Sequence, residues 1–355
     1  MIKVCAIMAT YNEGDIILES VRKLIDQGVD VYVIDNGSSD NTCDQLAPFI
    51  GRGVVDIEHA IFTEDGKEVY NWSALLELKE QVARKLGYDW FLHVDADEIR
   101  YSPWTDTSLQ EGLDRVDKAG FNLVNFKLFN FRLTSDLSAV NDFESAIIVY
   151  SRSEIFNQRQ VKAWKSSDHV SIAKSGGHMI RIPDPQVYPT RFILKHYPVR
   201  SLFHGQQKII AERKARFTTA ERQRGWHVQY DHLNEIGPKE VFYDKDALTQ
   251  FNLEHERLVL FEESNDVLCG HMIETRHFGE ALTADNFFNK WSTRLSLQGI
   301  APQDVSNLLS VAQGIINLFW RPSIPEILVS NRDAQVLTDI VHSLARLHVT
   351  VHPPP

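Results

Sequence analysis

The sequence predicts an α/β fold, a mostly parallel sheet with flanking helices, from three observations. Short apolar runs alternate with segments of helical periodicity, which is the order of strand–helix repeats. The runs are apolar on nearly every residue, as is typical of strands covered on both faces. Three of them end in polar loops, at residues 10–13, 35–42 and 95–98. Because ligands of open α/β sheets bind at the carboxyl ends of strands, we expect these loops to share one crevice.

The first elements form a strand–helix–strand unit. Residues 2–8 are a nearly continuous apolar run, and the apolar residues from Ile16 to Ile25 then follow helical spacing. Gly28 ends that helix, because glycine adopts the left-handed conformation of a helix end at little cost. Residues 29–34 form the second apolar run. This order predicts two parallel strands joined by a helix.

Further elements follow in the same manner. Residues 72–86 have helical spacing, and Gly87 closes that helix. Residues 90–94 form another apolar strand, whereas residues 121–133 alternate in the manner of an antiparallel strand. Residues 151–198 are rich in histidine, lysine, arginine, proline and glycine, so we expect loops and short strands that cover the crevice.

The pattern changes toward the C-terminus. Residues 204–217 predict a basic helix, and residues 285–319 are also helical in pattern. A chain of 355 residues allows about two domains, at roughly 100–200 residues each. We therefore predict one domain over residues 1–262 and a mainly helical C-terminal region over residues 263–355.

Composition and charge exclude several classes of protein. A hydrophobic content of 43% and a charged content of 24% are typical of a soluble globular protein. The net charge of −11 argues against a nucleic-acid partner. Three well-separated cysteines form no zinc or disulfide spacing, so we expect a cytoplasmic location. No run reaches the ~18 apolar residues of a membrane-spanning helix, so we expect at most a peripheral contact with a membrane.

The sequence Asp95-x-Asp97, with Glu98 beside it, carries the strongest chemical signal. Two carboxylates at positions i and i+2 of an extended segment point to the same side. Their oxygens suit Mg²⁺ or Mn²⁺, which would neutralise the charge of a diphosphate leaving group. An acidic turn that merely ends the strand is the alternative. The position directly after an apolar strand favours the metal site.

The other two polar loops also offer side-chain acceptors. The first runs from Thr10 to Glu13 and the second from Asp35 to Asp40, and a carboxylate such as Asp35 can accept a hydrogen bond from a uracil or ribose group. Both loops could instead cap the helices that follow them. Capping explains less well why both loops and the acid pair occur in this order along the chain.

Four segments resemble glycosyltransferase family 2 and its GT-A-type relatives, which are built on a Rossmann-type sheet. The segments are residues 9–13, 35–40, 94–98 and 195–201, and the last is similar to the His-Tyr-x-x-Arg-Ser ending of a subset of these enzymes. The resemblance covers about residues 3–215. It implies transfer of a sugar from a nucleotide-diphosphate donor to a hydroxyl acceptor, with inversion in a single displacement.

The resemblance also implies roles for individual residues. Those implied to bind the nucleotide sugar are Thr10, Tyr11, Glu13, Asp35, Asp40, Asp95, Arg200 and Lys208. Asp97 would be the principal ligand of Mn²⁺ or Mg²⁺, with Asp95 and His196 beside it. Arg200 offers a bidentate fork to a diphosphate and Lys208 a mobile point charge. The alternatives are a hydrogen-bonded histidine at a strand end for His196, and a solvated basic face for the two cations.

The general base is the least determined element of the site. Many family members carry a Glu-Asp pair on the acceptor side, but here the one such pair, at residues 64–65, precedes Asp95. The remaining candidates are Asp168, Glu144, Asp142 and His178. We predict Asp168, which lies beside His169 in a polar loop. The missing pair keeps a retaining mechanism open.

The function predicted from the sequence is metal-dependent sugar transfer from a UDP-, GDP- or dTDP-sugar. The acceptor would be a carbohydrate or a lipid-linked glycan, as for a precursor of a glycan or surface polysaccharide. A nucleotidyltransferase is one alternative, but residues 8–14 lack the glycine-rich basic loop that would hold a triphosphate. A non-catalytic module that binds a sugar or a protein partner is the other, and an activity measurement separates it.

Overall fold

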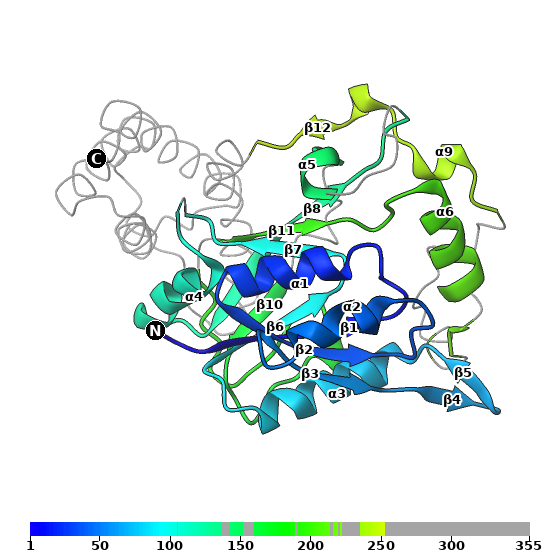
Figure 1. Ribbon diagram of the computed structural model, residues 1–355. Coiled ribbons are helices and arrows are strands. Elements are labelled where there is room, and N and C mark those ends of the chain that lie inside the picture. The colour runs from blue at the N-terminus through cyan, green and yellow to red at the C-terminus, as the bar shows by residue number, and fades with distance from the viewer. Residues whose placement is uncertain are drawn as a thin grey trace, which may run out of the picture. The chain divides into compact units, whose positions relative to one another are not determined.

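The computed structural model describes residues 1–104, 106–135, 143–151, 160–188, 191–213, 216–218, 221 and 235–252 (Figure 1). They lie within one compact unit, Met1–Arg257. The predicted boundary at residue 262, the C-terminal region 263–355 and Asp142 lie outside the described residues. Within the described part of the chain, no helix is long and apolar enough to cross a membrane.

Strands and helices alternate along the first third of the chain. The described strands are β1 (Val4–Thr10), β2 (Val29–Asp35), β3 (Val54–His59), β4 (Phe62–Glu64), β5 (Lys67–Val69), β6 (Trp90–Asp95), β7 (Glu98–Tyr101), β8 (Leu123–Phe131), β9 (Val149–Ser151), β10 (Val161–Lys165), β11 (Phe192–His196) and β12 (Thr249–Gln250). The described α-helices are α1 (Ile17–Asp26), α2 (Thr42–Leu46), α3 (Trp72–Lys85), α4 (Leu109–Lys118), α5 (Phe143–Ala146), α6 (Leu202–Gly205) and α9 (Pro238–Val241). Shorter turns are the 3₁₀ helices η1 (Ala47–Phe49), η3 (Ala173–Ser175) and η6 (Lys245–Ala247), and the π-helix is η4 (Gln206–Arg213).

Ten of the described strands form one mixed sheet. Its path runs β12-β9-β8-β10-β6-β1-β2-β3, with β11 paired to β8 and β7 paired to β11. The neighbouring strands β6, β1, β2 and β3 are parallel, whereas β10 is antiparallel to both β6 and β8. The predicted α/β fold with flanking helices is confirmed, with a parallel core.

Helices α1 and α3 lie on opposite faces of this parallel core (Figure 1). The strand order requires it, because the chain moves outward from β1 to β2 and β3 and then returns past β1 to β6. A right-handed crossover in one direction places its helix on one face, and the return crossover places its helix on the other. Helix α3 therefore covers the face opposite to α1.

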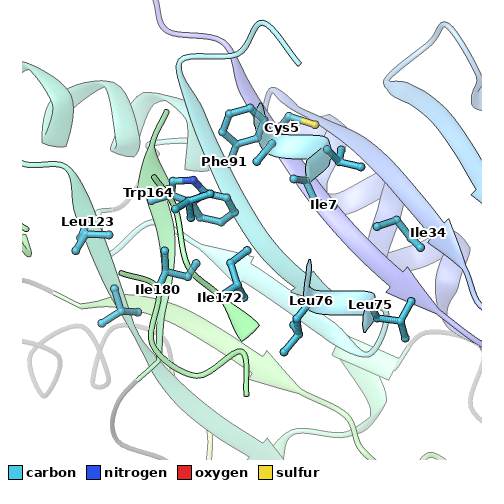
Figure 2. Packing of buried hydrophobic residues seen from close by; sticks show 14 of the residues in the cluster. Cys5, Ile7, Ile34, Leu75, Leu76, Phe91, Leu123, Trp164, Ile172 and Ile180 are labelled. Atoms are coloured by element: carbon cyan, nitrogen blue, oxygen red, sulfur yellow. The ribbon is translucent and has the colours of Figure 1, made fainter. Parts of the chain in front are cut away.

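The core beneath α3 is apolar and closely packed (Figure 2). Its members include Cys5, Ile7, Leu75, Leu76, Phe91 and Trp164. Because successive residues of a strand point to opposite faces, alternate positions of β1 and β6 contribute to it. Cys5 pairs with Phe91 and Ile7 pairs with His93 in the parallel register. His93 thus continues the row of Phe91 on the α3 face, where an apolar side chain would be the ordinary choice.

Candidate active site

A cavity of about 250 Å³ lies at the carboxyl ends of β1 and β6. Elements from distant parts of the chain supply its walls, among them the start of α3, the turn after η3 and the π-helix η4. The cavity is lined by eight of the residues that the sequence singled out: Thr10, Tyr11, Glu13, Asp95, Asp97, His178, His196 and Lys208.

The parallel register explains why the three polar loops meet. Thr10 pairs with Asp35, and Ala9 pairs with Asp95. The three strands therefore end at the same level, and the loops that follow them share one edge of the sheet. The predicted common crevice is confirmed by this register.

Asp97 lies between two positively charged or basic groups. Its Oδ2 atom is 2.8 Å from the Nζ atom of Lys208 and 3.6 Å from the Nε2 atom of His196. The same Lys208 ammonium is 2.7 Å from a carboxylate oxygen of Glu13. Burial raises the pKa of Asp97, but Lys208 and His196 together hold this pKa well below its ordinary value. Asp97 is therefore ionised at neutral pH.

Asp95 is more accessible and faces two lysines. Its side chain is 32% exposed, and its two oxygens are each 3.7 Å from an ammonium nitrogen, one of Lys79 and one of Lys162. Lys162 also donates to Glu98 at 2.6 Å. Despite burial, Lys162 and Arg100 lower the pKa of Glu98 to about 2. Lys79, Lys162 and Arg100 thus balance the negative charges of Asp95 and Glu98 beside the cavity.

The sequence analysis did not single out Lys79 or Lys162. Lysine is rarely fully buried, so its presence in a helix or strand pattern is ordinarily assigned to the surface. Lys79 lies on α3 and is nevertheless completely covered. The fold accommodates this buried ammonium through its contacts with His93 and Val94 of β6. No local sequence pattern indicates these contacts.

The donor atoms near Asp97 are of the kind that a divalent cation binds. A carboxylate oxygen and an imidazole nitrogen suit Mn²⁺, and Asp95 adds a second, accessible carboxylate. The three side chains do not form one compact set, however. Among the described residues, the groups whose ligand atoms all lie within 4.8 Å of one another are Asp35–Cys43–His59 and Glu13–Asp15–His204. A cation at Asp97 would share the carboxylate with the ammonium of Lys208.

Asp35 and Asp40 hold the second loop in place and are not among the residues that line the cavity. Asp35 is buried and accepts hydrogen bonds from the backbone N–H groups of Gly37 and Ser38, at 3.1 Å each. Asp40 accepts from the backbone N–H of Thr42 at 2.9 Å. Asp35 thus closes a turn within its own loop, and Asp40 binds the first residue of α2, whose N-cap residue is Asn41.

Arg200 is also outside the cavity lining. Its side chain is fully buried and donates through Nε to Asp15 at 2.7 Å. It also contacts the carboxylate of Glu13 and donates to the carbonyl oxygen of Tyr197 at 3.1 Å. The burial of Arg200 contradicts the solvated-face alternative, and its donors are directed at the loop after β1.

Asp168 lies at the opposite edge of the sheet from Asp95. Strand β10 is antiparallel to β6, and its last residue, Lys165, pairs with Trp90 at the start of β6. The next residue, Ser166, donates its N–H to the carbonyl oxygen of Asp89 at 2.8 Å. Asp168, predicted as the base of the acceptor site, therefore follows the end of β10 that lies beside the start of β6, and it is not among the residues that line the cavity.

Of the remaining candidate bases, His178 alone lines the cavity among the described residues. Glu144 lies on α5, where its carboxylate is 2.5 Å from Lys195 and 2.9 Å from Lys23. The predicted basic helix over 204–217 begins earlier, at Leu202, and continues as the π-helix that carries Lys208. Such π-turns are frequent at functional sites.

Comparison with known proteins gives one family and several distant structures. The model of glycosyl transferase family 2 matches residues 5–65. No curated protein sequence matches the chain. The structure of S. aureus TarS is 13% identical, with a TM-score of 0.34, over 55% of this chain and 36% of that chain. This chain thus spans little more than a third of the TarS chain.

Two further structures show similarly low scores. TarS 1–349 from S. aureus, in complex with UDP, is 12% identical with a TM-score of 0.35, over 99% of this chain and 92% of that chain. Glucosyl-3-phosphoglycerate synthase from Mycobacterium tuberculosis, in complex with phosphoglyceric acid, is 19% identical with a TM-score of 0.23. That match covers 36% of this chain and 44% of the synthase.

The family match includes the first two polar loops. Residues 5–65 span β1, α1 and β2 together with the segments that carry Thr10 and Asp35. The parallel core and the cavity at its carboxyl edge agree with this match. Residues 5–65 of the chain are therefore similar to glycosyl transferase family 2.

Proposed function

We propose that the chain transfers a sugar from a UDP-, GDP- or dTDP-sugar to a hydroxyl group of a carbohydrate or lipid-linked glycan, with Mn²⁺ or Mg²⁺ as cofactor. One observation carries the proposal. Thr10, Asp97 and Lys208 come from three distant parts of the sequence and line one cavity at the carboxyl edge of the sheet. A nucleoside, a metal and a diphosphate can be bound side by side there.

The nucleoside is assigned to the side of the cavity formed by the end of β1. Tyr11 presents an aromatic ring that the guanidinium of Arg216 covers at 3.8 Å from the ring centre. Arg216 also donates to the backbone oxygen of Asn36 at 3.1 Å. On the other side, the rings of Tyr70 and Trp72 are stacked with 6.0 Å between centres. Flat apolar walls with a few fixed polar groups are typical of pockets for small ligands.

The diphosphate is assigned to the cationic side of the cavity. Lys208 and Lys162 both line it, and each of them is nearly buried. An ammonium in a poorly solvated site interacts strongly with phosphate oxygens. Asp97, Asp95 and His196 would hold the metal, which when bound neutralises charge on the leaving diphosphate.

His178 is proposed as the general base in place of Asp168. Burial lowers the pKa of His178, and the charge of Lys162 lowers it further, so its imidazole is neutral at pH 7. A neutral imidazole can accept the proton of the acceptor hydroxyl while that oxygen attacks the anomeric carbon. The bond from that carbon to the diphosphate breaks at the same time, which gives inversion of configuration.

Changing His178 to Ala is expected to lower the rate of transfer by ~10²–10⁴, which is the usual effect of losing a positioned base. Binding of the nucleotide sugar should change little, because the base acts on the acceptor. Initial rates with saturating donor, together with calorimetric donor affinity, measure the two effects separately. A variant that transfers at the wild-type rate would remove His178 from the mechanism.

Changing Asp168 to Asn is expected to leave the transfer rate unchanged. The side chain is exposed and lies at the far edge of the sheet, so its loss alters neither the cavity nor a buried contact. The same rate assay measures it, which makes Asp168→Asn the matched control for His178→Ala. A large loss of rate in Asp168→Asn alone would restore the original prediction.

A donor screen tests the function as a whole. UDP-, GDP- and dTDP-sugars are added with Mn²⁺, and thermal unfolding and release of the nucleoside diphosphate are followed. A donor present at ~100 times its Kd stabilises the folded state by about 2.7 kcal/mol, which gives a measurable shift of Tm. If no nucleotide sugar shifts the Tm and none is hydrolysed, the proposed function is wrong.

A further inference from the structure

His93 presents an unsatisfied polar atom to the cavity. Its side chain is 1% exposed, it lines the cavity, and its Nε2 atom has no hydrogen-bond partner among the described residues. A buried polar atom without a partner is costly, so such atoms in native proteins call for an explanation. A bound ligand that supplies the missing partner is one.

The contact of the other ring nitrogen determines whether Nε2 is a hydrogen-bond donor or an acceptor. The Nδ1 atom is 2.9 Å from the Nζ atom of Lys79, which also donates to the carbonyl oxygen of Val94 at 2.8 Å. An ammonium can only donate, so Nδ1 is the acceptor. The single proton of a neutral imidazole then lies on Nε2. His93 therefore offers an N–H donor, whereas His196 faces a carboxylate of the acid pair.

Gly177 lies close to this donor and covers it with no side chain. A Cβ atom at Gly177 would lie 2.8 Å from Nε2, so any other residue at this position would crowd the donor. The backbone beside Gly177 is held by Trp72, whose indole N–H donates to the carbonyl oxygen of Gly176 at 3.0 Å. The ring of Trp72 lies 5.9 Å from the ring of His93. A single N–H donor between the Trp72 ring and the backbone of Gly177 is suited to an oxygen acceptor of a ligand.

We propose that the Nε2–H group of His93 donates a hydrogen bond to an uncharged acceptor oxygen of the bound donor substrate and so contributes to donor selection. This inference rests on the proposed function, because it takes a nucleotide sugar as the ligand. The oxygen belongs either to a sugar hydroxyl or to a carbonyl of the nucleobase. The phosphate oxygens are matched instead by the charged groups of Lys162 and Lys208, which line the same cavity.

Two variants separate the hydrogen bond from the packing of the ring. His93→Asn keeps an acceptor near Nδ1 for Lys79 but removes the donor at Nε2. His93→Gln is longer and places an amide N–H near the original Nε2 position. Calorimetric Kd values are measured for UDP-glucose, GDP-mannose and dTDP-glucose and for UDP, GDP and dTDP. Thermal unfolding checks that each variant is folded, and the affinities are compared only between folded proteins.

The loss of one neutral hydrogen bond is expected to weaken binding about threefold to tenfold in His93→Asn, with recovery in His93→Gln. If the sugar is the partner, only the nucleotide sugar binds more weakly; if the base is the partner, the nucleoside diphosphate weakens equally. Wild-type affinity of His93→Asn for both ligands overturns the inference. A wild-type protein that binds none of the six compounds instead overturns the proposed function, and the inference with it.

Discussion

Replacing Arg200 by leucine is expected to lower the free energy of unfolding by about 3 kcal/mol. The guanidinium is fully buried and is the cation for Asp15 and, with Lys208, for Glu13. Breaking a buried ion pair leaves a charge without compensation, which costs about 3–5 kcal/mol. We expect the lower end of this range because the side chain of Asp15 is 39% exposed. Urea unfolding at pH 7 measures the change.

A surface arginine provides the matched control. Arg52 is exposed, so Arg52→Leu should change the stability by no more than about 0.5 kcal/mol. Arg200→Lys keeps the charge but loses the planar fork, and an intermediate loss of stability is expected. If Arg200→Lys weakened binding of UDP or GDP with no loss of stability, Arg200 would return to the diphosphate role that the sequence suggested.

The meeting of the three polar loops was predictable from the sequence, because it follows from the pairing of parallel strands. Thr10, Asp35 and Asp95 each end an apolar run, and neighbouring parallel strands carry their ends to one edge. The position of Asp168 was not predictable in the same way, because it depends on the direction of β10. That direction is set by pairing with β6 and β8, and the five residues of β10 carry no local sign of it.

The buried charges were beyond sequence analysis for a different reason. Lys79 follows Leu75 by one helical turn and so lies on the buried side of α3. A lysine there is tolerated because His93 and Val94 accept hydrogen bonds from its ammonium and Asp95 lies nearby. Likewise, Arg200 contacts Asp15 across 185 positions of sequence. Such pairs depend on tertiary packing, which amphipathic periodicity does not describe.

Asp97→Asn is expected to reduce kcat/KM for sugar transfer by ~10²–10⁴, since charge stabilisation of a leaving diphosphate is worth several kcal/mol. The substitution keeps the shape of the side chain and removes its charge. It removes the negative charge that His196 and Lys208 share, so both the proposed metal and the ammonium beside it lose their anionic partner. Rates at increasing Mn²⁺ concentration measure the effect, and excess Mn²⁺ should not restore activity.

The same substitution distinguishes a role in catalysis from a role in stability. Because Asp97 is buried and paired with Lys208, Asp97→Asn should also lower the free energy of unfolding. The loss should be limited, because Glu13 remains as a partner of Lys208. The folded fraction at assay temperature should therefore stay near that of the wild type, while turnover falls. Asp114→Asn is the control, because Asp114 also pairs with a lysine, Lys118, but is not among the residues that line the cavity. If Asp97→Asn turns over at the wild-type rate in Mn²⁺, Asp97 binds neither the metal nor the donor. A residue that only balances the charge of Lys208 would alter stability and leave the rate unchanged.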